Sequence, residues 1–201
     1  MKIKRKNIEL AVILGLVCSI LLSFSHFDAA CDDLRNNVFR LHILANSDSE
    51  VDQSVKLLVR DAVINEAGSL FDGKTELQDA LLTAEENISL FNEIANKVLC
   101  ENGFDYTAKV RIGESFFENR EYDDFTLPAG VYQSLIIELG KAEGKNWWCV
   151  IFPSICVSAA SKADLSDSTS NVSSNIAKSP KRYKVKFKAI EFYEEIKRIF
   201  T

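Results

Sequence analysis

The alternation of apolar and polar residues over residues 38–45 predicts a β-strand, with Arg40 and His42 on the side opposite three large apolar residues. Short polar side chains follow directly. Ser49, with Asp52 three residues later, resembles the capping box that begins a helix. Beyond it, apolar residues recur at helical spacing and predict two helices, one ending near residue 67 and one running from residue 75 to residue 101.

Alternation of apolar and polar residues returns in the second half of the chain. It predicts strands over residues 106–112, 125–139 and 147–152, with a polar, acidic loop over residues 113–124. The last two strands are joined by turn-forming residues and are most simply an antiparallel hairpin. The order of elements predicts an α+β fold: a mostly antiparallel sheet with two helices packed on one face, plus a C-terminal amphipathic helix.

Residues 1–25 have the pattern of a targeting segment. Four basic residues precede an apolar stretch over residues 10–22, and Ser23 or Ser25 could serve a signal peptidase. The stretch is shorter than the ~20 residues that span a bilayer, so a cleaved export signal is favoured. An uncleaved N-terminal anchor stays open, as does a lipoprotein modified at Cys31. In each case the rest of the chain lies outside the cytosol.

The remaining chain divides into three predicted segments. Residues 34–157 form the α+β domain, residues 158–180 a flexible Ser-rich linker, and residues 181–201 a basic segment with an amphipathic helix. That helix could lie on an acidic membrane surface, bind a partner, or pack one face on the domain. Packing of one face on the domain is favoured, and a membrane surface contact through the N-terminus or through this helix stays open.

Charge argues against a nucleic-acid partner. The chain has 201 residues, 47% of them apolar, and a formal charge of −5. Residues 26–201 hold 20 of the basic and 28 of the acidic side chains, which gives −8. A nucleic-acid-binding protein normally has the opposite sign.

Four of the five cysteines lie outside the targeting segment, an even number that permits disulfides in an exported protein. Cys149 and Cys156 are close in sequence and are a candidate bridge; buried free thiols are the alternative. The spacing of cysteine and histidine is not that of a zinc site. Neither a nucleophile elbow, a zinc-protease motif nor a phosphate-binding glycine loop is present, so no cofactor is predicted.

Candidate chemistry is limited to a few residues. His42 is the only histidine outside the N-terminal segment, and a hydrolase would have to pair it with Asp48 or Cys149. An oxygen-rich cluster follows the first strand, but its spacing does not fit a calcium loop, and helix capping explains it better than a metal does. The cluster consists of Asn46, Asp48, Asp52 and Gln53.

Trp147 and Trp148 stand side by side in the last predicted strand. Neighbouring strand residues point to opposite faces, so only one indole can enter a core beneath the sheet. The other is either covered by another part of the chain or left exposed. An exposed ring would be a candidate docking contact, because Trp is enriched among interface hot spots.

Two long segments resemble the signatures of the stage II sporulation protein R family. The first begins RLHILANSDS at residue 40 and continues through Asp52, Gln53 and residues 56–63. The second comprises residues 128–135 and residues 144–153, the latter reading GKNWWCVIFP. The segments occur in the same order within residues 36–157. Residues 158–201 carry no matching motif, so the resemblance implies nothing about their role.

The resemblance implies a signalling protein rather than an enzyme. Such a protein is exported from the forespore into the septal intermembrane space and activates a membrane-embedded aspartic protease of the mother cell. That protease removes the pro-sequence of a sigma factor precursor. Two rival functions stay open: an extracytoplasmic hydrolase and a membrane-anchored structural protein of the envelope. The residues predicted to bind the partner are Arg40, His42, Asn46, Asp48, Asp52, Gln53, Trp147 and Trp148.

Overall fold

A four-stranded sheet organises the protein, whose computed structural model describes residues 5–122, 125–153 and 169–200. The strand order is β2–β5–β1–β6. β1 (Phe39–Leu44) pairs in parallel with β5 (Gly130–Leu139) and antiparallel with β6 (Asn146–Phe152). β2 (Ala108–Phe117) pairs antiparallel with β5. The predicted α+β class with a mostly antiparallel sheet is confirmed.

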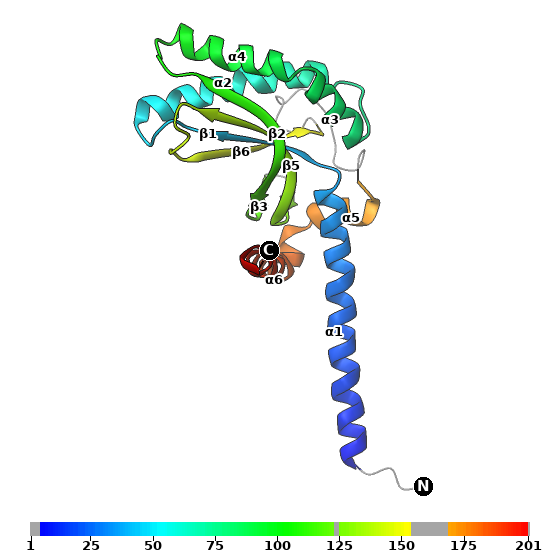
Figure 1. The fold of residues 1–201 in the computed structure, drawn as a ribbon. Helices are drawn as coiled ribbons and strands as arrows, with labels where there is room; N and C mark the ends of the chain where they lie inside the picture. Colours follow the sequence, from blue (N-terminus) through cyan, green and yellow to red (C-terminus); the bar gives the residue numbers. More distant parts are fainter. Residues whose placement is uncertain (1–4, 123–124, 154–168, 201) are drawn as a thin grey trace.

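Three helices cover the first face of the sheet (Figure 1). They are α2 (Glu50–Leu70), α3 (Leu77–Glu86) and α4 (Ile88–Glu101). Their apolar stripes meet the alternate residues of the strands in the main hydrophobic core, because both periodicities place apolar side chains on one side. This core includes Leu41, Ile43, Val59, Phe91, Leu99, Leu135 and Ile151, each at most 1% exposed.

The single helix predicted over residues 75–101 is two helices in the structure. Asn87 ends α3 and precedes α4, with φ −107° and ψ 16°, outside the helical region. Its side-chain amide donates to the carbonyl of Thr83 at 2.8 Å. Asparagine competes in this way with backbone hydrogen bonding, which explains why an unbroken apolar stripe contains a break.

The predicted hairpin of the last two strands is wrong, because β1 lies between β5 and β6. Phe39, Leu41 and Ile43 of β1 are fully buried on the helix-covered side, and the central position pairs both edges of that strand. The connection at residues 140–145 crosses the end of β1. Its backbone bonds there, since the amide of Gly144 donates to the carbonyl of Ala45 at 2.9 Å.

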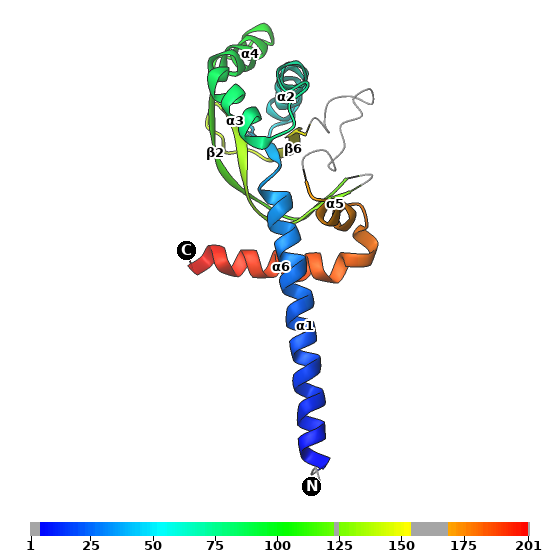
Figure 2. The ribbon, with the colours of Figure 1, turned by 90° about the vertical axis from the view of Figure 1, so that its right-hand side faces the viewer.

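The two ends of the chain approach the second face of the sheet. α1 (Arg5–Arg35) continues ten residues beyond the predicted targeting segment, and its last turns are buried beside α5 (Asn171–Ala177) and α6 (Pro180–Phe200). α6 lies across α1 (Figure 2). β3 (Arg120–Glu121) and β4 (Thr126–Leu127) form a short antiparallel pair on the same side of the sheet. β2 and β3 occupy part of the predicted loop over residues 113–124.

α5 falls within the segment predicted to be a linker. Ser170 caps it by accepting a hydrogen bond from the amide of Ser173 at 3.3 Å. Ile176 and Ala177 are buried against α1 and the second face, so two apolar residues in a Ser-rich stretch are enough to dock one short helix. The rest of the predicted linker, residues 158–168, lies outside the described residues.

Candidate functional site

The junction between β1 and α2 is organised around the carboxylate of Asp52, which is 7% exposed. It accepts hydrogen bonds from Asn46 at 2.9 Å, from Ser47 at 2.6 Å and from the hydroxyl of Tyr106 at 2.6 Å. Burial alone would raise the pKa of Asp52, but these bonds favour the charged form and hold the pKa below its usual value. The amide of Asp52 donates to Ser49, so Ser49 is the predicted N-cap.

The same junction fastens the connection between β5 and β6. Asn46 accepts from the amide of Lys141 at 3.0 Å, and Asp48 accepts from the amide of Lys145 at 2.7 Å. The ammonium of Lys56, 4% exposed, donates to the carbonyl of Lys145 at 2.9 Å and to Gln53 at 2.6 Å. The first signature segment is thus hydrogen-bonded to residues 144–153, the later part of the second.

Two glycines allow this close approach. A Cβ at Gly144 would lie 2.2 Å from the carbonyl oxygen of Ser47, which is backbone and cannot rotate away. A Cβ at Gly140, whose φ is +56°, would lie 2.3 Å from Oδ1 of Asn46. The oxygen-rich cluster therefore holds two backbone segments together. Within the described part of the chain, no three His, Cys, Asp or Glu side chains gather in a metal-binding group.

Arg40 is fully buried on the second face of the sheet. Its guanidinium carbon lies 3.8 Å from the ring centroid of Phe117 and 4.9 Å from that of Tyr132, and it donates to the hydroxyl of Tyr122 at 3.2 Å. Nε and Nη1 have no hydrogen-bond partner among the described residues. The charge is therefore held largely by aromatic rings, an arrangement whose strength increases when water is excluded.

His42 lies beside Arg40 on the second face and is half-buried. Nδ1 is 3.2 Å from the hydroxyl of Ser115, and Nε2 is 3.1 Å from Oδ1 of Asn146. Burial lowers the pKa of His42, and the bond to Asn146 only partly offsets this. Asp48 bonds instead to the backbone of Lys145, so the pairing of His42 with Asp48 that the rival hydrolase function would need does not occur.

The two tryptophans lie on opposite faces of β6, as the strand period predicts. Trp147 packs against the helix-covered core with the guanidinium of Arg60 above its ring, 4.5 Å from the centroid. Trp148 packs on the second face, with its ring centroid 5.8 Å from Phe117 and 6.2 Å from His42. Both are half-buried, so each indole is partly covered and neither stands free.

Cys149 follows the tryptophans and points into the helix-covered core, on the face opposite His42. It is disulfide-bonded and 7% exposed, so it offers no nucleophile to His42. Cys156 lies outside the described residues, and the 149–156 pairing stays a prediction.

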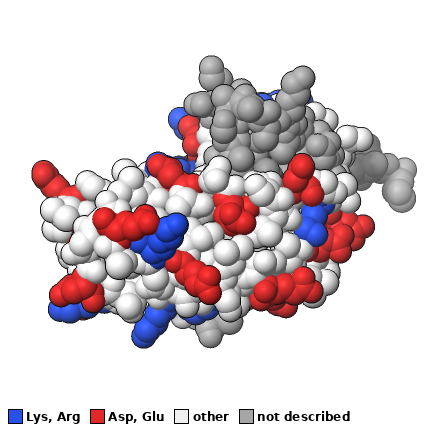
Figure 3. Space-filling view, turned by 90° about the horizontal axis from the view of Figure 1, so that it is seen from above, with Lys and Arg blue, Asp and Glu red and all other residues white. Residues whose placement is uncertain are grey.

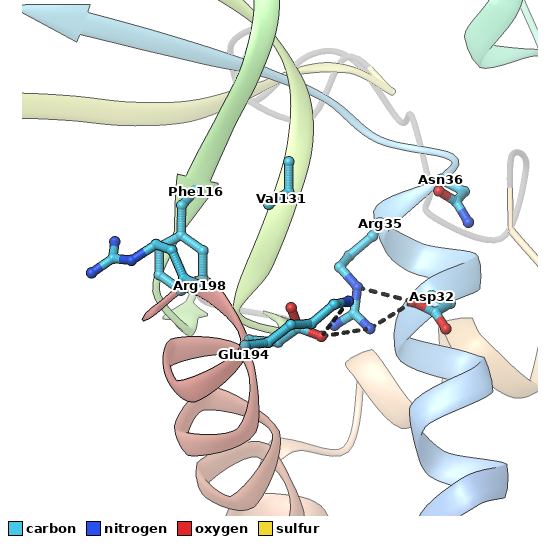
Figure 4. A pocket seen from close by; sticks show the side chains of 8 residues that line it. Asp32, Arg35, Asn36, Phe116, Val131, Glu194 and Arg198 are labelled. Carbon is cyan, nitrogen blue, oxygen red and sulfur yellow. Dashed lines mark hydrogen bonds and ion pairs between the residues drawn. The ribbon is translucent and has the colours of Figure 1, made fainter. Parts of the chain in front are cut away.

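Sequence patterns did not indicate the cluster around Arg35 at the end of α1 (Figure 4). This guanidinium, 7% exposed, bonds Asp32 at 2.7 Å and the carbonyl of Ala129 at 2.9 Å, and lies 3.7 Å from Glu194 of α6. Arg35, Asp32 and Glu194 border a pocket of about 370 Å³ between α1, α6 and the tips of β2 and β5. The cluster joins residues 159 positions apart in sequence, which no local pattern can reveal.

The predicted partner-binding residues thus fall into two groups. Arg40 and Asp52 are buried and hold the fold, whereas Asp48 is exposed and His42, Asn46, Gln53, Trp147 and Trp148 are half-buried. Their contact with a partner stays a prediction.

Fold and site together define a small α+β domain that continues from a long apolar helix. α1 is the one helix in the described ranges that is long and apolar enough to cross a membrane, a pattern that also fits a signal sequence. Residues 35–162 match the family described as Stage II sporulation protein R, and the chain belongs to that family.

A relative is the Stage II sporulation protein R of Bacillus subtilis (strain 168), which is 34% identical over 121 residues. The match covers 60% of this chain and 54% of the relative, so it spans about half the relative's length. No solved structure matches.

Proposed function

We propose that the protein is an exported sporulation signal that activates a membrane-embedded aspartic protease of the mother cell. It would act across the septal intermembrane space and trigger processing of the sigma factor precursor. The observation that carries the proposal is membership of the stage II sporulation protein R family over residues 35–162, the part that contains both signature segments. The apolar helix α1 supports it, because it fits an export signal or an anchor.

The docking surface that we propose is the open part of the second sheet face. Helices cover the first face, and the buried cluster around Arg40 covers one half of the second face. The other half of the second face holds the half-buried His42 and Trp148. Arg111 is exposed nearby and is paired to Glu138 at 3.1 Å. This surface carries a half-buried indole and an exposed cation, and Trp and Arg are common anchors in interfaces.

Reconstitution tests the function directly. A heterologous cell would express the membrane protease, the sigma precursor and this protein in its exported form, and precursor cleavage would be followed by immunoblot. We expect cleavage only when all three are present. Precursor that stays intact in the presence of all three would overturn the proposal, as would cleavage that does not require this protein.

Two exposed charge reversals test the docking surface in the same cell. Arg111→Glu, on the open sheet face, should reduce cleavage severely, because the charge at the contact changes sign. Lys97→Glu, on the outer side of α4, is the matched control and should leave cleavage unchanged; its side chain is 73% exposed. Equal effects of the two variants would place the docking surface elsewhere, without affecting the activator function itself.

A second candidate function is hydrolysis, which one observation favours. Ser115, His42 and Asn146 form a continuous hydrogen-bonded chain in which the imidazole could accept the serine proton and the amide could orient the ring. Ester hydrolysis that is abolished by Ser115→Ala, with cleavage of the sigma precursor lost as well, would favour this function over activation.

A further inference from the structure

α6 has two apolar faces, and only one of them is covered by the protein. Phe187 and Ile190, 4% and 0% exposed, pack on Phe27, Ala30 and Cys31 of α1. The other face is exposed along the length of the helix. Its residues are Val185, Phe192, Ile196, Ile199 and Phe200, with exposed fractions of 83%, 66%, 38%, 75% and 84%. Spacings of seven, four and three residues put the first four on one stripe.

The uncovered stripe lies next to the end of the apolar part of α1. Phe27 stacks on Tyr183 of α6 with ring centroids 5.6 Å apart, and the ammonium of Lys186 donates to the hydroxyl of Ser23 at 2.8 Å. Toward the N-terminus the apolar side chains of α1 are exposed as far back as Ile8. From Ile8 to Phe27 the helix rises about 30 Å, the thickness of a bilayer's hydrocarbon core.

The crossing of the two helices therefore sets the position of α6. If α1 enters a bilayer, then α6, which lies across it at Phe27, lies in the plane of the headgroups (Figure 2). An interfacial helix has this orientation, with its apolar stripe embedded at the boundary of the acyl chains.

The charges near the stripe indicate the kind of surface. Residues 178–200 contain eight basic and three acidic side chains, whereas the remaining chain contains 16 basic and 26 acidic ones. The opposite end of the domain, seen from above, carries more acidic than basic side chains (Figure 3). A basic amphipathic helix on an otherwise acidic protein is attracted to anionic lipid and directs the acidic end away from it.

We propose that α6 is an interfacial helix that binds the anionic surface of the bilayer entered by α1. Its exposed stripe embeds in that surface, while its packed face is joined to α1 through Phe27 and through the ion pair of Arg35 with Glu194. Two attachments at a fixed crossing hold the second sheet face toward the membrane. This inference is independent of the proposed activation of a protease.

Depth measurement with a spin label tests the proposal on the full-length chain. The label would be attached at Phe192→Cys in a background of Cys18→Ala and Cys100→Ser, since Cys31 is buried and Cys149 is disulfide-bonded. In vesicles of equimolar phosphatidylglycerol and phosphatidylcholine, we expect oxygen to reach the label and a water-soluble nickel chelate to be excluded. A label at Lys97→Cys on α4 is the matched control and should remain accessible to the chelate.

Three results would overturn the proposal. One is a label at residue 192 that the nickel chelate reaches in vesicles as freely as it does in detergent. Another is spin–spin broadening that disappears on dilution with unlabelled protein, which would make a second copy the occupant of the stripe. The third is equal protection in vesicles of phosphatidylcholine alone, which would remove the role of anionic lipid.

A pair of variants checks the stripe independently of labelling. Phe192→Ser combined with Ile199→Ser should abolish the protection from hydrogen exchange that vesicles confer on residues 192–199. Residues 186–190 should remain protected by packing on α1, which shows that α6 is still folded. Leu82→Ser, at an exposed apolar residue of α3, is the control. It should leave the protection of residues 192–199 and of residues 186–190 unchanged. Unchanged protection of residues 192–199 in the double variant would contradict the inference.

Discussion

The two faces of the central sheet are covered in different ways. The first face is covered by α2, α3 and α4, which follow β1 and precede β2 in the chain, and its core is almost wholly apolar. The second face is approached by α1 from one end of the chain and by α5 and α6 from the other. It also contains the buried charged groups Arg35, Arg40 and Glu194. On the first side the buried charged groups, Asp52 and Lys56, lie at the β1–α2 junction and not in the apolar core.

This difference bears on stability. Burial of apolar side chains contributes favourably without exact geometry, whereas buried charges contribute only while their partners stay in place. Contacts between distant parts of the chain also cost more loop-closure entropy than contacts between neighbours. We infer that the helix-covered face forms the stable unit and that the second face opens first.

The largest expected difference in global stability is between two variants, each of which truncates one buried phenylalanine, one on each side of the sheet. Phe91→Ala on α4 should reduce the free energy of unfolding by about 3–5 kcal/mol, since the side chain is fully buried in the main core. Phe187→Ala on α6 should leave the main unfolding transition nearly unchanged. It should instead accelerate hydrogen exchange in α5 and α6, because their docking on Phe27 is lost.

Urea denaturation and mass-spectrometric hydrogen exchange on the full chain in detergent would measure both effects. Equal losses of global stability would show that the two faces unfold as one cooperative unit and that the second face does not open first.

The next effect concerns the backbone contact that links the two signature segments. Gly144→Ala should destabilise the protein by about 3 kcal/mol, because the new methyl group would meet the carbonyl of Ser47 and force two backbone segments apart. Gly103→Ala is the matched control: φ is +80° but nothing lies within 4 Å, so only the conformational cost of about 1–2 kcal/mol applies. Chemical denaturation compares the two, and a Gly144 variant no worse than the Gly103 variant would contradict the close approach.

Local patterns predict the first face better than the second. The helical spacing behind Ser49 and the period of two around Leu41 each specify a buried side, and the structure agrees with both. The break at Asn87 and the insertion of β1 between β5 and β6 depend on competition between hydrogen bonds and between strand partners. Such competition is decided by tertiary contacts that spacing does not encode.

The candidate site shows the same limit. The polar residues after β1 are recognisable as a helix cap, yet Tyr106 and the amides of Lys141 and Lys145 reach them from far along the chain. Arg35 has an ordinary surface-helix sequence around it and is buried where α1 meets both α6 and the start of β5. Long-range partners of this kind determine whether a polar residue binds another molecule or holds the fold.

A smaller effect is expected from the carboxylate at the β1–α2 junction. Asp52→Asn should cost about 2 kcal/mol at neutral pH, because hydrogen bonds to a charged acceptor are replaced by weaker ones. The pKa of Asp52 is lower in the folded state, so its contribution is fully present above its ordinary pKa near 4 and is lost as pH falls through the folded value. Denaturation at several pH values should therefore show a flatter acid limb in the variant.

Tyr106→Phe provides the comparison for that result. It removes one donor and leaves the carboxylate charged, so the acid limb should keep its shape while the stability at neutral pH falls by a smaller amount. An acid limb that is unchanged in Asp52→Asn would assign the pH dependence to other carboxyl groups.

The smallest effect concerns His42 on the open part of the second face. Burial lowers the pKa of His42, so the folded protein favours the neutral ring. Stability is fully present above the ordinary pKa of about 6.5 and decreases as pH falls from there through the folded value, by less than about 1 kcal/mol. Proton NMR of the ring Cε1–H should give a midpoint below 6.5, and Arg111→Ala should raise it slightly, since that exposed cation disfavours the charged ring. A midpoint at about 6.5 would mean that the ring is as open to water as in the unfolded chain, and that the second face is already partly open in solution despite the contacts with Phe117 and Trp148. A midpoint above 6.5 would mean that the bond to Asn146 and the carboxylate of Glu138 outweigh burial.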